Sequence, residues 1–320
     1  MKSEQTSRVK DKYKVRNWKE YNKSLVQRGE ISLWLDPSVM RAWRDVPKTK
    51  VVGEEQYPDC VIQCCLVLGK VYHQPLRQTT GFVRSLLKLM GCGGYKVPDY
   101  STLCRRQGSL PAEVSEAICE GKKLDIAIDS TGLKVYGEGE WKVRKHGASK
   151  RRVWQKMHIG IDIHTQQILS VKLTSNSVDD AKAAADMLEG EKRLRSFWGD
   201  GAYDDFHFRE VLGPDVRQVI PPPKDAVEHK GSKKKEVPAY LDQRNEAVRF
   251  IHEQGREEWK KQSGYHLRSR NETVMFRYKT TFGGKLEARK EANQSTEIIL
   301  KCKILNRFRQ TGMPQAYKVA

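Results

Sequence analysis

The segment Leu124-Asp-Ile-Ala-Ile-Asp-Ser-Thr-Gly132 decides the fold of this chain, because it reads as a β-strand that carries a carboxylate at its end. Leu124, Ile126 and Ile128 alternate with smaller or charged residues, as expected for a strand. Gly132 is typical of the turn that follows one. Asp129 is therefore expected at the carboxyl end of a strand, although taken alone it could be an ordinary turn or capping residue.

A second aspartate has the same kind of context. Asp200 closes the short apolar segment that starts at Leu194, and the dipeptide Asp200-Gly201 stops that segment. A helix is expected from Asp204 or Asp205 onward. Asp-Gly is common in turns, but two aspartates at strand ends in one chain are harder to explain that way.

The third acidic residue lies in a segment with helical spacing. Tyr265, Arg268, Glu272 and Lys279 recur at i, i+3, i+7 and i+14, which at about 100° per residue places them within roughly a 60° arc. One helix face would then present a carboxylate, two cations and a phenol. A solvated helix surface can carry the same residue types by chance, so the helix supports a functional site only together with the two aspartates.

Three carboxylates that converge from two strands and a helix suit divalent metal ions. Mg²⁺ takes oxygen ligands, usually one or two carboxylates with phosphate oxygens and water. Two such ions about 3.5 to 4 Å apart can activate an attacking oxygen and stabilise a leaving oxygen in phosphoryl transfer. We therefore expect Asp129, Asp200 and Glu272 to bind two Mg²⁺ ions, with Mn²⁺ as a possible substitute.

The charge balance favours a polyanionic partner. Lys and Arg number 59 against 40 Asp and Glu, which gives a formal net charge of +19 over 320 residues and most simply indicates nucleic acid. No segment approaches the roughly 20 apolar residues of a membrane span, and the basic start lacks the apolar core of a signal peptide. We expect no membrane partner and a cytoplasmic location. The cysteines and histidines lack the spacing of zinc sites.

Composition divides the chain into three parts. Residues 1–115 combine a basic arm with helices that are interrupted near Pro75. Residues 120–222 and 264–320 are expected to form one α/β domain, with a mixed sheet and helices packed on it. Residues 223–263 are polar and are expected to be an insertion before the last helices. The expected elements of the α/β domain are strands at 124–129, 153–163 and 168–174, a helix at 179–188, the strand into Asp200, a helix near 204–212 and a short segment from Gln218.

A helix, a glycine turn and a short basic helix in residues 59–106 suggest a helix-turn-helix. The segment from Asp99 would be the recognition helix, which enters the major groove of DNA. Its candidate contacts with phosphates or base edges are Tyr100, Thr102, Arg105 and Arg106. An ordinary helical hairpin with a solvated basic end explains the same pattern equally well.

The motif Tyr265-His-Leu-Arg268-Ser-Arg-Asn-Glu272, continued to Lys279, resembles the Y-x-x-R-x-x-x-E-x-x-x-x-x-x-K signature of bacterial insertion-sequence transposases of the DDE superfamily. The resemblance covers nearly the whole chain and points to the insertion-sequence-five group. It includes Asp129-Ser-Thr-Gly-Leu-Lys134, Asp200-Gly-Ala-Tyr203 and Gly312-Met-Pro314. A ribonuclease H-like fold is implied for the α/β domain.

The resemblance also implies an activity, that of a metal-dependent DNA transposase and endonuclease that binds the terminal inverted repeats of its element. Water would attack the phosphodiester at an element end, and the freed 3′ hydroxyl would attack target DNA. Arg268 and Lys279 would hold phosphates near the cleaved end, and Tyr265 would donate a hydrogen bond to one of them. A complex of paired DNA ends implies a homodimer.

Two further features could contact DNA. Trp259 lies shortly before Tyr265, where related transposases place an aromatic ring that can hold an unpaired base; the simpler explanation is that it anchors the helix to the core. The basic tract that includes Lys142, Arg144 and Lys145 would lie against DNA, or is a charged hairpin. The other tryptophans of the α/β domain are expected to be structural: Trp141, Trp154 and Trp198.

Two other functions fit parts of the sequence. A general nuclease of the same fold would cut DNA without recognising terminal repeats, and the separate N-terminal DNA-reading region argues against it. A domesticated, sequence-specific DNA-binding protein would need no catalysis. The acidic triad argues against that function, since three carboxylates repel phosphate unless a metal neutralises them.

Overall fold

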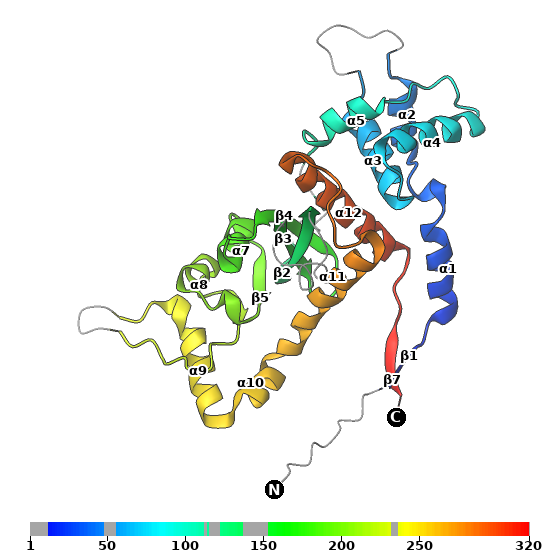
Figure 1. The fold of residues 1–320 in the computed structure, drawn as a ribbon. Coiled ribbons are helices and arrows are strands. Elements are labelled where there is room, and N and C mark those ends of the chain that lie inside the picture. Colours follow the sequence, from blue (N-terminus) through cyan, green and yellow to red (C-terminus); the bar gives the residue numbers. More distant parts are fainter. Residues whose placement is uncertain are drawn as a thin grey trace, which may run out of the picture.

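A computed structural model describes residues 12–47, 56–111, 114, 122–136, 153–231 and 236–319. Within these ranges the chain forms a helical part at its start and an α/β part built on a five-stranded sheet. The two parts lie on either side of the long helix α12 (Glu291–Thr311), as Figure 1 shows.

The sheet is mixed, with the strand order β4-β3-β2-β5-β6. The first three strands in sequence pair antiparallel, whereas β5 pairs parallel with both β2 and β6. The α/β class and the mixed sheet expected from the sequence are therefore confirmed. The strands are β2 (Leu124–Tyr136), β3 (Val153–Asp162), β4 (Ile168–Ser175), β5 (Leu194–Trp198) and β6 (Arg217–Val219).

Helices cover both faces of the sheet. α7 (Asp180–Leu188) and α8 (Phe206–Leu212) pack on the face that carries Ile126 and Ile128. α11 (Ser269–Phe282) and α12 pack on the opposite face, in a core that includes Ala127. Because successive side chains of a strand point to opposite faces, Asp129 shares the α11 face with Ala127.

The region expected as an insertion contains two helices, α9 (Asp242–Gln254) and α10 (Arg256–Ser263). A buried charge network ties α9 to the sheet domain: Asp204 accepts hydrogen bonds from Arg209 Nε at 2.8 Å and from Arg244 Nε at 3.1 Å. The lysine run Lys233-Lys-Lys235 lies outside the described residues.

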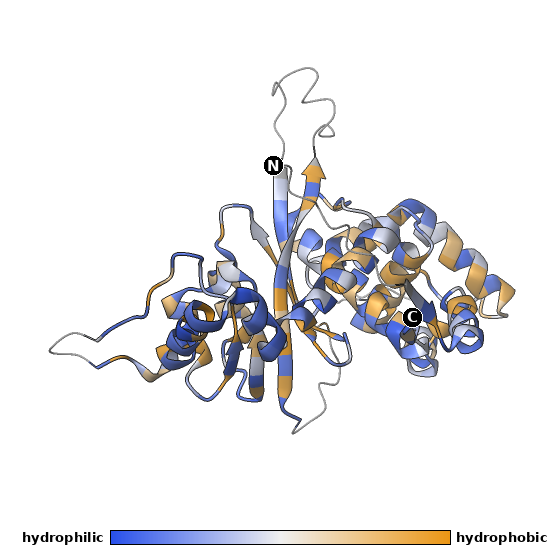
Figure 2. Ribbon diagram, turned by 90° about the horizontal axis from the view of Figure 1, so that it is seen from below, coloured by the Kyte–Doolittle hydropathy of each residue, from blue (hydrophilic) through white to orange (hydrophobic). Residues whose placement is uncertain are grey.

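The helical part is built around α2 (Pro37–Arg44), α3 (Asp59–Val71), α4 (Leu76–Leu89) and α5 (Tyr100–Gln107). Figure 2 shows apolar and polar residues alternating along the helices, as expected for helices with one buried face. Leu300 and Ile304 of α12 belong to the core of this part, whereas Ile298 and Cys302 belong to a core beside the sheet. α12 therefore joins the two parts, because its sides are buried in different cores.

The described part of the basic start, residues 12–47, packs against the rest of the protein. β1 (Lys12–Val15) pairs antiparallel with β7 (Ala316–Val319), and α1 (Trp18–Arg28) packs along α12. Trp43 is buried, and its Nε1 donates to the carbonyl of Lys96 at 2.7 Å. Among the helices of the described ranges, none is both long and apolar enough to cross a bilayer.

The expected end of the first sheet strand was wrong. β2 continues past Asp129 to Tyr136, so this aspartate lies inside a strand. The strand stays extended because β3 pairs with it along this whole stretch, and because the main chain of Lys134 also bonds to Gly284 and Leu286. Pairing partners that are distant in sequence thus override the local signal of Gly132.

Two smaller expectations also differ from the structure. The segment from Tyr265 begins as the 3₁₀ turn η4 (Tyr265–Arg268) and becomes α-helical only at Ser269. Trp198 is buried as expected, but Trp154 is 40% exposed and is not a core residue. Trp154 lies over Gly132, where no Cβ keeps the ring away.

Candidate active site

Asp129 lies where β2 loses one of its two neighbours. β5 pairs with β2 only from Leu124 to Ala127, whereas β3 continues beside it. The Asp129 carboxylate accepts a hydrogen bond from the backbone N of Ser130 at 2.8 Å and another from Arg268 Nη1 at 2.8 Å. The carboxylate is thus presented next to the edge that β5 has left.

Asp200 follows β5 and begins the short 3₁₀ turn η2 (Gly201–Tyr203). Its Oδ1 accepts a hydrogen bond from the backbone N of Ala202 at 2.9 Å, so it does cap a turn. Gly199 is required by close packing, since a Cβ there would lie 2.7 Å from ring atoms of both Phe197 and Tyr203. This packing fixes the point at which Asp200 leaves the sheet.

Asn271 attaches α11 to the sheet beside Asp129. Its side chain is fully buried, and its Nδ2 donates to the carbonyls of Ala127 at 3.0 Å and Ile159 at 2.9 Å. These bonds fix the height and rotation of α11, and so place Glu272, the next residue, near Asp129. Sequence reasoning missed Asn271, because a single asparagine inside a helical pattern carries no signal of its own.

Arg268 lies between the carboxylates. Its Nη1 donates to Asp129 Oδ2 at 2.8 Å, and its Nη2 donates to Glu272 Oε1. Burial lowers the pKa of Arg268, but Tyr265, Asp129, Glu272 and Asp200 raise it more, so that it exceeds its ordinary value. The structure therefore joins Asp129 and Glu272 through one guanidinium, and Asp200 lies near enough to raise the pKa of the same group.

The electrostatics of Asp129 reflect this crowding. Burial raises its pKa, the Ser130 hydrogen bond and Arg268 lower it, and Asp200 and Glu272 raise it again, with a net increase. Burial first, and the two neighbouring carboxylates after it, thus make Asp129 harder to ionise. A bound cation relieves this kind of repulsion.

Carboxylate oxygens are the donors that Mg²⁺ and Mn²⁺ prefer, so the residues present fit the expected ions. In the part of the chain that the structure describes, no three Asp, Glu, His or Cys side chains are already arranged to share an ion. Arg268 engages two of the three carboxylates instead. An ion bound at Asp129, Asp200 and Glu272 would therefore compete with Arg268 for Asp129 Oδ2 and Glu272 Oε1.

Tyr265 packs between Arg268 and Trp259. The guanidinium carbon of Arg268 lies 5.8 Å from the centre of the Tyr265 ring, and the centres of the Tyr265 and Trp259 rings lie 5.8 Å apart. Trp259 is only 7% exposed and belongs to the core. This burial favours the anchoring role for Trp259 over stacking on a base.

The exposed face of α11 carries Glu272, Phe276 and Lys279, which share it through the spacings i, i+4 and i+7. Phe276 is 69% exposed, although it is aromatic and lies one helical turn from Glu272. Sequence reasoning did not single it out. The available signal was its i+4 spacing from Glu272.

α5 begins at the expected place, where the Asp99 side chain accepts a hydrogen bond from the backbone N of Ser101 at 2.9 Å. Arg106 donates to the carbonyl of Tyr57 at 2.9 Å and pairs with Asp59, so it ties α5 to α3. The other candidate contacts on this helix remain at least partly exposed: Tyr100, Thr102 and Arg105. Lys142, Arg144 and Lys145 lie outside the described residues.

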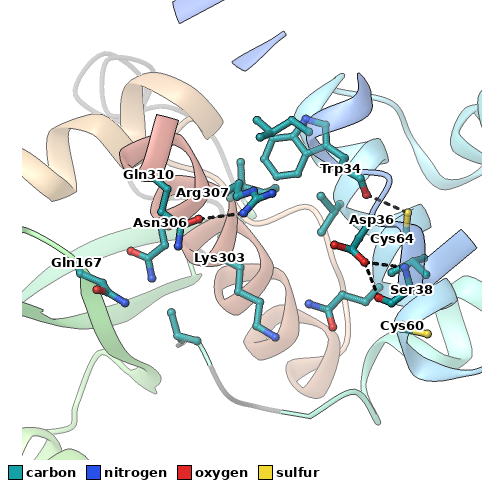
Figure 3. Close-up of a pocket in the computed structure, with 16 residues that line it drawn as sticks. Trp34, Asp36, Ser38, Cys60, Cys64, Gln167, Lys303, Asn306, Arg307 and Gln310 are labelled. Carbon is teal, nitrogen blue, oxygen red and sulfur yellow. Dashed lines mark hydrogen bonds between the residues drawn. The ribbon is translucent and has the colours of Figure 1, made fainter. Parts of the chain in front are cut away.

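A cavity of about 580 Å³ lies between α3, the turn η1 (Ile31–Leu33) and α12. Figure 3 shows Asp36 and Ser38 on one side of it and Lys303 and Arg307 on the other. None of the three acidic residues lines this cavity, so it is separate from the carboxylate site.

A family model described as a transposase DDE domain matches residues 120–307, and a second model with the same description matches residues 26–138. The first match covers more than half of the chain. The chain therefore belongs to the transposases with a DDE domain, a class of enzymes that cleave and transfer DNA.

Among solved structures, the chain is similar to one described as the cryo-EM structure of a piggyBac transposase synaptic complex with hairpin DNA. The identity is 11%, the match covers 90% of this chain and 81% of that chain, and the TM-score is 0.27. A likeness at this level supports no conclusion about this chain.

Proposed function

We propose that this chain is the transposase of an insertion sequence. It binds the terminal inverted repeats, hydrolyses a phosphodiester at each end and joins the freed 3′ hydroxyls to target DNA. The observation that carries the proposal is that Arg268 joins Asp129 of β2 to Glu272 of α11, with Asp200, at the end of β5, near enough to raise the pKa of the same guanidinium. The reaction class follows from family membership, and we assign the reaction to the site that these residues form.

The sheet supports a ribonuclease H-like fold for the α/β part. Three antiparallel strands, β4, β3 and β2, continue into two parallel strands, β5 and β6, which follow helices, so that β2 is the central strand of the five. The central strand and its parallel neighbour supply Asp129 and Asp200, and the helix that packs across them supplies Glu272. A carboxylate site at this place is thus a consequence of the topology.

In this proposal Asp129, Asp200 and Glu272 hold two Mg²⁺ ions, or Mn²⁺ in their place. When bound, the ions polarise the phosphodiester and favour the ionised form of the attacking oxygen. The three carboxylates are positioned before DNA arrives by the β2 ladder, by the close packing at Gly199 and by Asn271.

Arg268 then has two successive partners. In this structure it pairs with Asp129 and Glu272. With Asp129 and Glu272 holding a divalent cation, the Arg268 guanidinium would bind a phosphate of the DNA end, for which its planar fork of donors is suited. Lys279 contacts the same strand from the exposed face of α11, and Tyr265 donates a hydrogen bond to a phosphate.

The helical part recognises the repeats in this proposal. α5 lies in the major groove, with Tyr100, Thr102 and Arg105 facing DNA, while Arg106 holds the helix in place through Asp59. Two copies of the chain, each bound to one element end, would form the paired-end complex.

The test compares the wild type with Glu272→Gln on DNA that carries the inverted repeats flanking the gene. We expect Mg²⁺-dependent cleavage at the repeat boundary by the wild type, and loss of cleavage with unchanged binding in Glu272→Gln. Glu210→Gln serves as a matched control, because it removes the same charge from an exposed position on α8, on the other face of the sheet.

Other outcomes favour the competing functions. Cleavage that ignores the repeats indicates a general nuclease. Binding of the repeats without cleavage by the wild type, in Mg²⁺ and in Mn²⁺, indicates a DNA-binding regulator and contradicts the proposal.

A further inference from the structure

Three arginines from different elements line one small cavity between α1, α11 and α12. The cavity has a volume of about 150 Å³, and its lining includes Arg28 of α1, Arg277 of α11 and Arg309 of α12. Gln166, from the turn between β3 and β4, lines the same space. These residues are distant in sequence, so the cluster exists only in the folded chain.

The donors of these arginines are only partly used, and their acceptors are neutral. Arg277 Nη1 donates to Gln166 Oε1 at 2.7 Å, and Arg28 Nη2 donates to the carbonyl of Gly312 at 2.7 Å. Arg309 makes long contacts of 3.3 and 3.4 Å, and its Nε is buried without a partner. A buried donor without an acceptor is unfavourable, so the cluster is better satisfied with an acceptor bound.

The charges are also uncompensated. Within the described residues no carboxylate lines the cavity or forms an ion pair with any of the three arginines. Burial lowers the pKa of Arg277, the neighbouring Tyr21 raises it and Arg28 lowers it, so that it falls below its ordinary value. Cations that face one another without a counter-charge favour an anion between them.

The turn that supplies Gln166 is held in an unusual conformation. Gln166 has a positive φ of 59°, a region that residues other than glycine rarely adopt. The Asp162 carboxylate fixes the turn by accepting hydrogen bonds from the backbone N of His164 at 3.1 Å and of Thr165 at 2.6 Å. The fixed turn directs Gln166 to Arg277, which orients the guanidinium before any ligand binds.

We propose that this arginine cavity binds a phosphate group of the DNA strand that continues beyond the carboxylate site along α11. The inference rests on the proposed function, because that function brings DNA to Glu272. Arg277 follows Glu272 by five positions, which is about 7.5 Å along the helix axis, or roughly two nucleotides, and roughly 140° around it. Phe276, which shares the exposed face with Glu272, also lines the cavity and so lies between the two sites. A volume of 150 Å³ equals roughly five water molecules, enough for a phosphate group.

The experiment measures binding of the full chain to repeat-bearing DNA at several salt concentrations. Arg277→Gln and Arg309→Gln are compared, singly and together, with the wild type. The control double variant is Lys182→Gln with Lys192→Gln, which removes the same charge from exposed positions near α7. Arg277→Lys keeps the charge but loses the planar fork of donors.

We expect the Arg277→Gln, Arg309→Gln double variant to bind about tenfold more weakly and to lower the slope of log affinity against log salt by about 1. Arg277→Lys should retain most of the slope, and the lysine control should match the wild type. If the double variant unfolds, the affinity and salt slope of the single Arg309→Gln variant are used to test the inference. Wild-type affinity and slope in folded arginine variants would overturn the inference.

A second experiment distinguishes a DNA phosphate from a free anion as the ligand of the cavity. Thermal unfolding is measured in inorganic phosphate and in chloride at equal ionic strength, and a ligand of the folded state raises the unfolding temperature. Phosphate that stabilises the wild type more than the arginine variants, together with unchanged DNA binding, would identify a free-anion site and overturn the DNA assignment. If the proposed function itself is wrong, the result differs from both of these outcomes, because the wild type then does not cleave the repeats.

Discussion

The Nη1 atom of Arg268 lies 2.8 Å from Oδ2 of Asp129, so a cation of the protein itself engages a carboxylate that we assign to a metal ion. The same guanidinium also engages Glu272. Arg268 and a divalent ion therefore compete for two of the same three ligands.

Arg268→Gln should consequently bind Mn²⁺ more tightly than the wild type, by about tenfold, because the competing charge is gone. Its cleavage activity should nevertheless fall, since a phosphate contact is lost. Titration calorimetry with Mn²⁺ measures the affinity. Arg270→Gln is the matched control, because Arg270 lies on the same helix and donates to the carbonyl of Ile163. If Arg268→Gln binds Mn²⁺ no more tightly than the wild type does, Arg268 does not compete with the metal ion.

Asn271→Ala tests how α11 is positioned. Loss of the two buried hydrogen bonds to Ala127 and Ile159 should lower the free energy of unfolding by about 2 kcal/mol. Cleavage should fall further than the unfolded fraction explains, because Glu272 loses its alignment with Asp129. Urea denaturation and single-turnover cleavage provide the two readouts. The control is Thr273→Ala, at an exposed position on the same helix. If Asn271→Ala and Thr273→Ala show the same stability and the same cleavage rate, Asn271 does not position α11.

Phe276→Ala tests whether DNA lies along the exposed face of α11. The side chain is 69% exposed, so its removal should change the free energy of unfolding by less than about 0.5 kcal/mol. Binding to the repeats should weaken about tenfold, as expected when an aromatic contact with a base or sugar is lost. Val211→Ala on α8 is a control at an exposed apolar position away from this face. Unchanged binding by Phe276→Ala would place the DNA elsewhere.

Asp125 should make the free energy of unfolding depend on pH in the acid range. Its side chain is 3% exposed; burial raises its pKa, but hydrogen bonds from Arg195, Ser196 and His164 lower it more, from 3.8 to about 2. Because the folded pKa is the lower one, this carboxylate stabilises the fold above about pH 4, and the contribution disappears as the pH falls towards 2.

Asp125→Asn should therefore be less stable than the wild type by about 2 kcal/mol at pH 7. The difference should shrink as the pH falls from about 4 towards 2. Urea denaturation across this pH range measures it. A difference that stays constant down to about pH 2 would show that the ionised carboxylate is not its source.

Local patterns predicted much of the fold. The strand expected at 153–163 and the helix expected at 179–188 correspond to β3 and α7. The length of β2 was not visible, because it depends on pairing with β3 and on the bridge to Lys285, which is distant in sequence. The pairing of β1 with β7 could not be predicted for the same reason, because the two strands are distant in sequence.

Residue types and spacing led to the prediction of the acidic triad, which stays a prediction, and the structure adds what surrounds its members. The sequence could not show that Arg268 joins two of the carboxylates, that Trp259 is buried or that Arg106 is tied to Asp59. Each depends on side-chain partners from other elements. The arginine cavity is a further case, because its members are separated by nearly the whole chain.

The most direct test of the central claim is a change of metal preference in Asp129→Cys. A thiolate is a poor ligand for Mg²⁺ and a better one for softer ions. The account predicts that this variant binds the repeats, cleaves them in Mg²⁺ at least about a thousandfold more slowly than the wild type, and recovers part of the activity in Mn²⁺ or Cd²⁺. Cleavage in Mg²⁺ at the wild-type rate would contradict the assignment of Asp129 as a metal ligand.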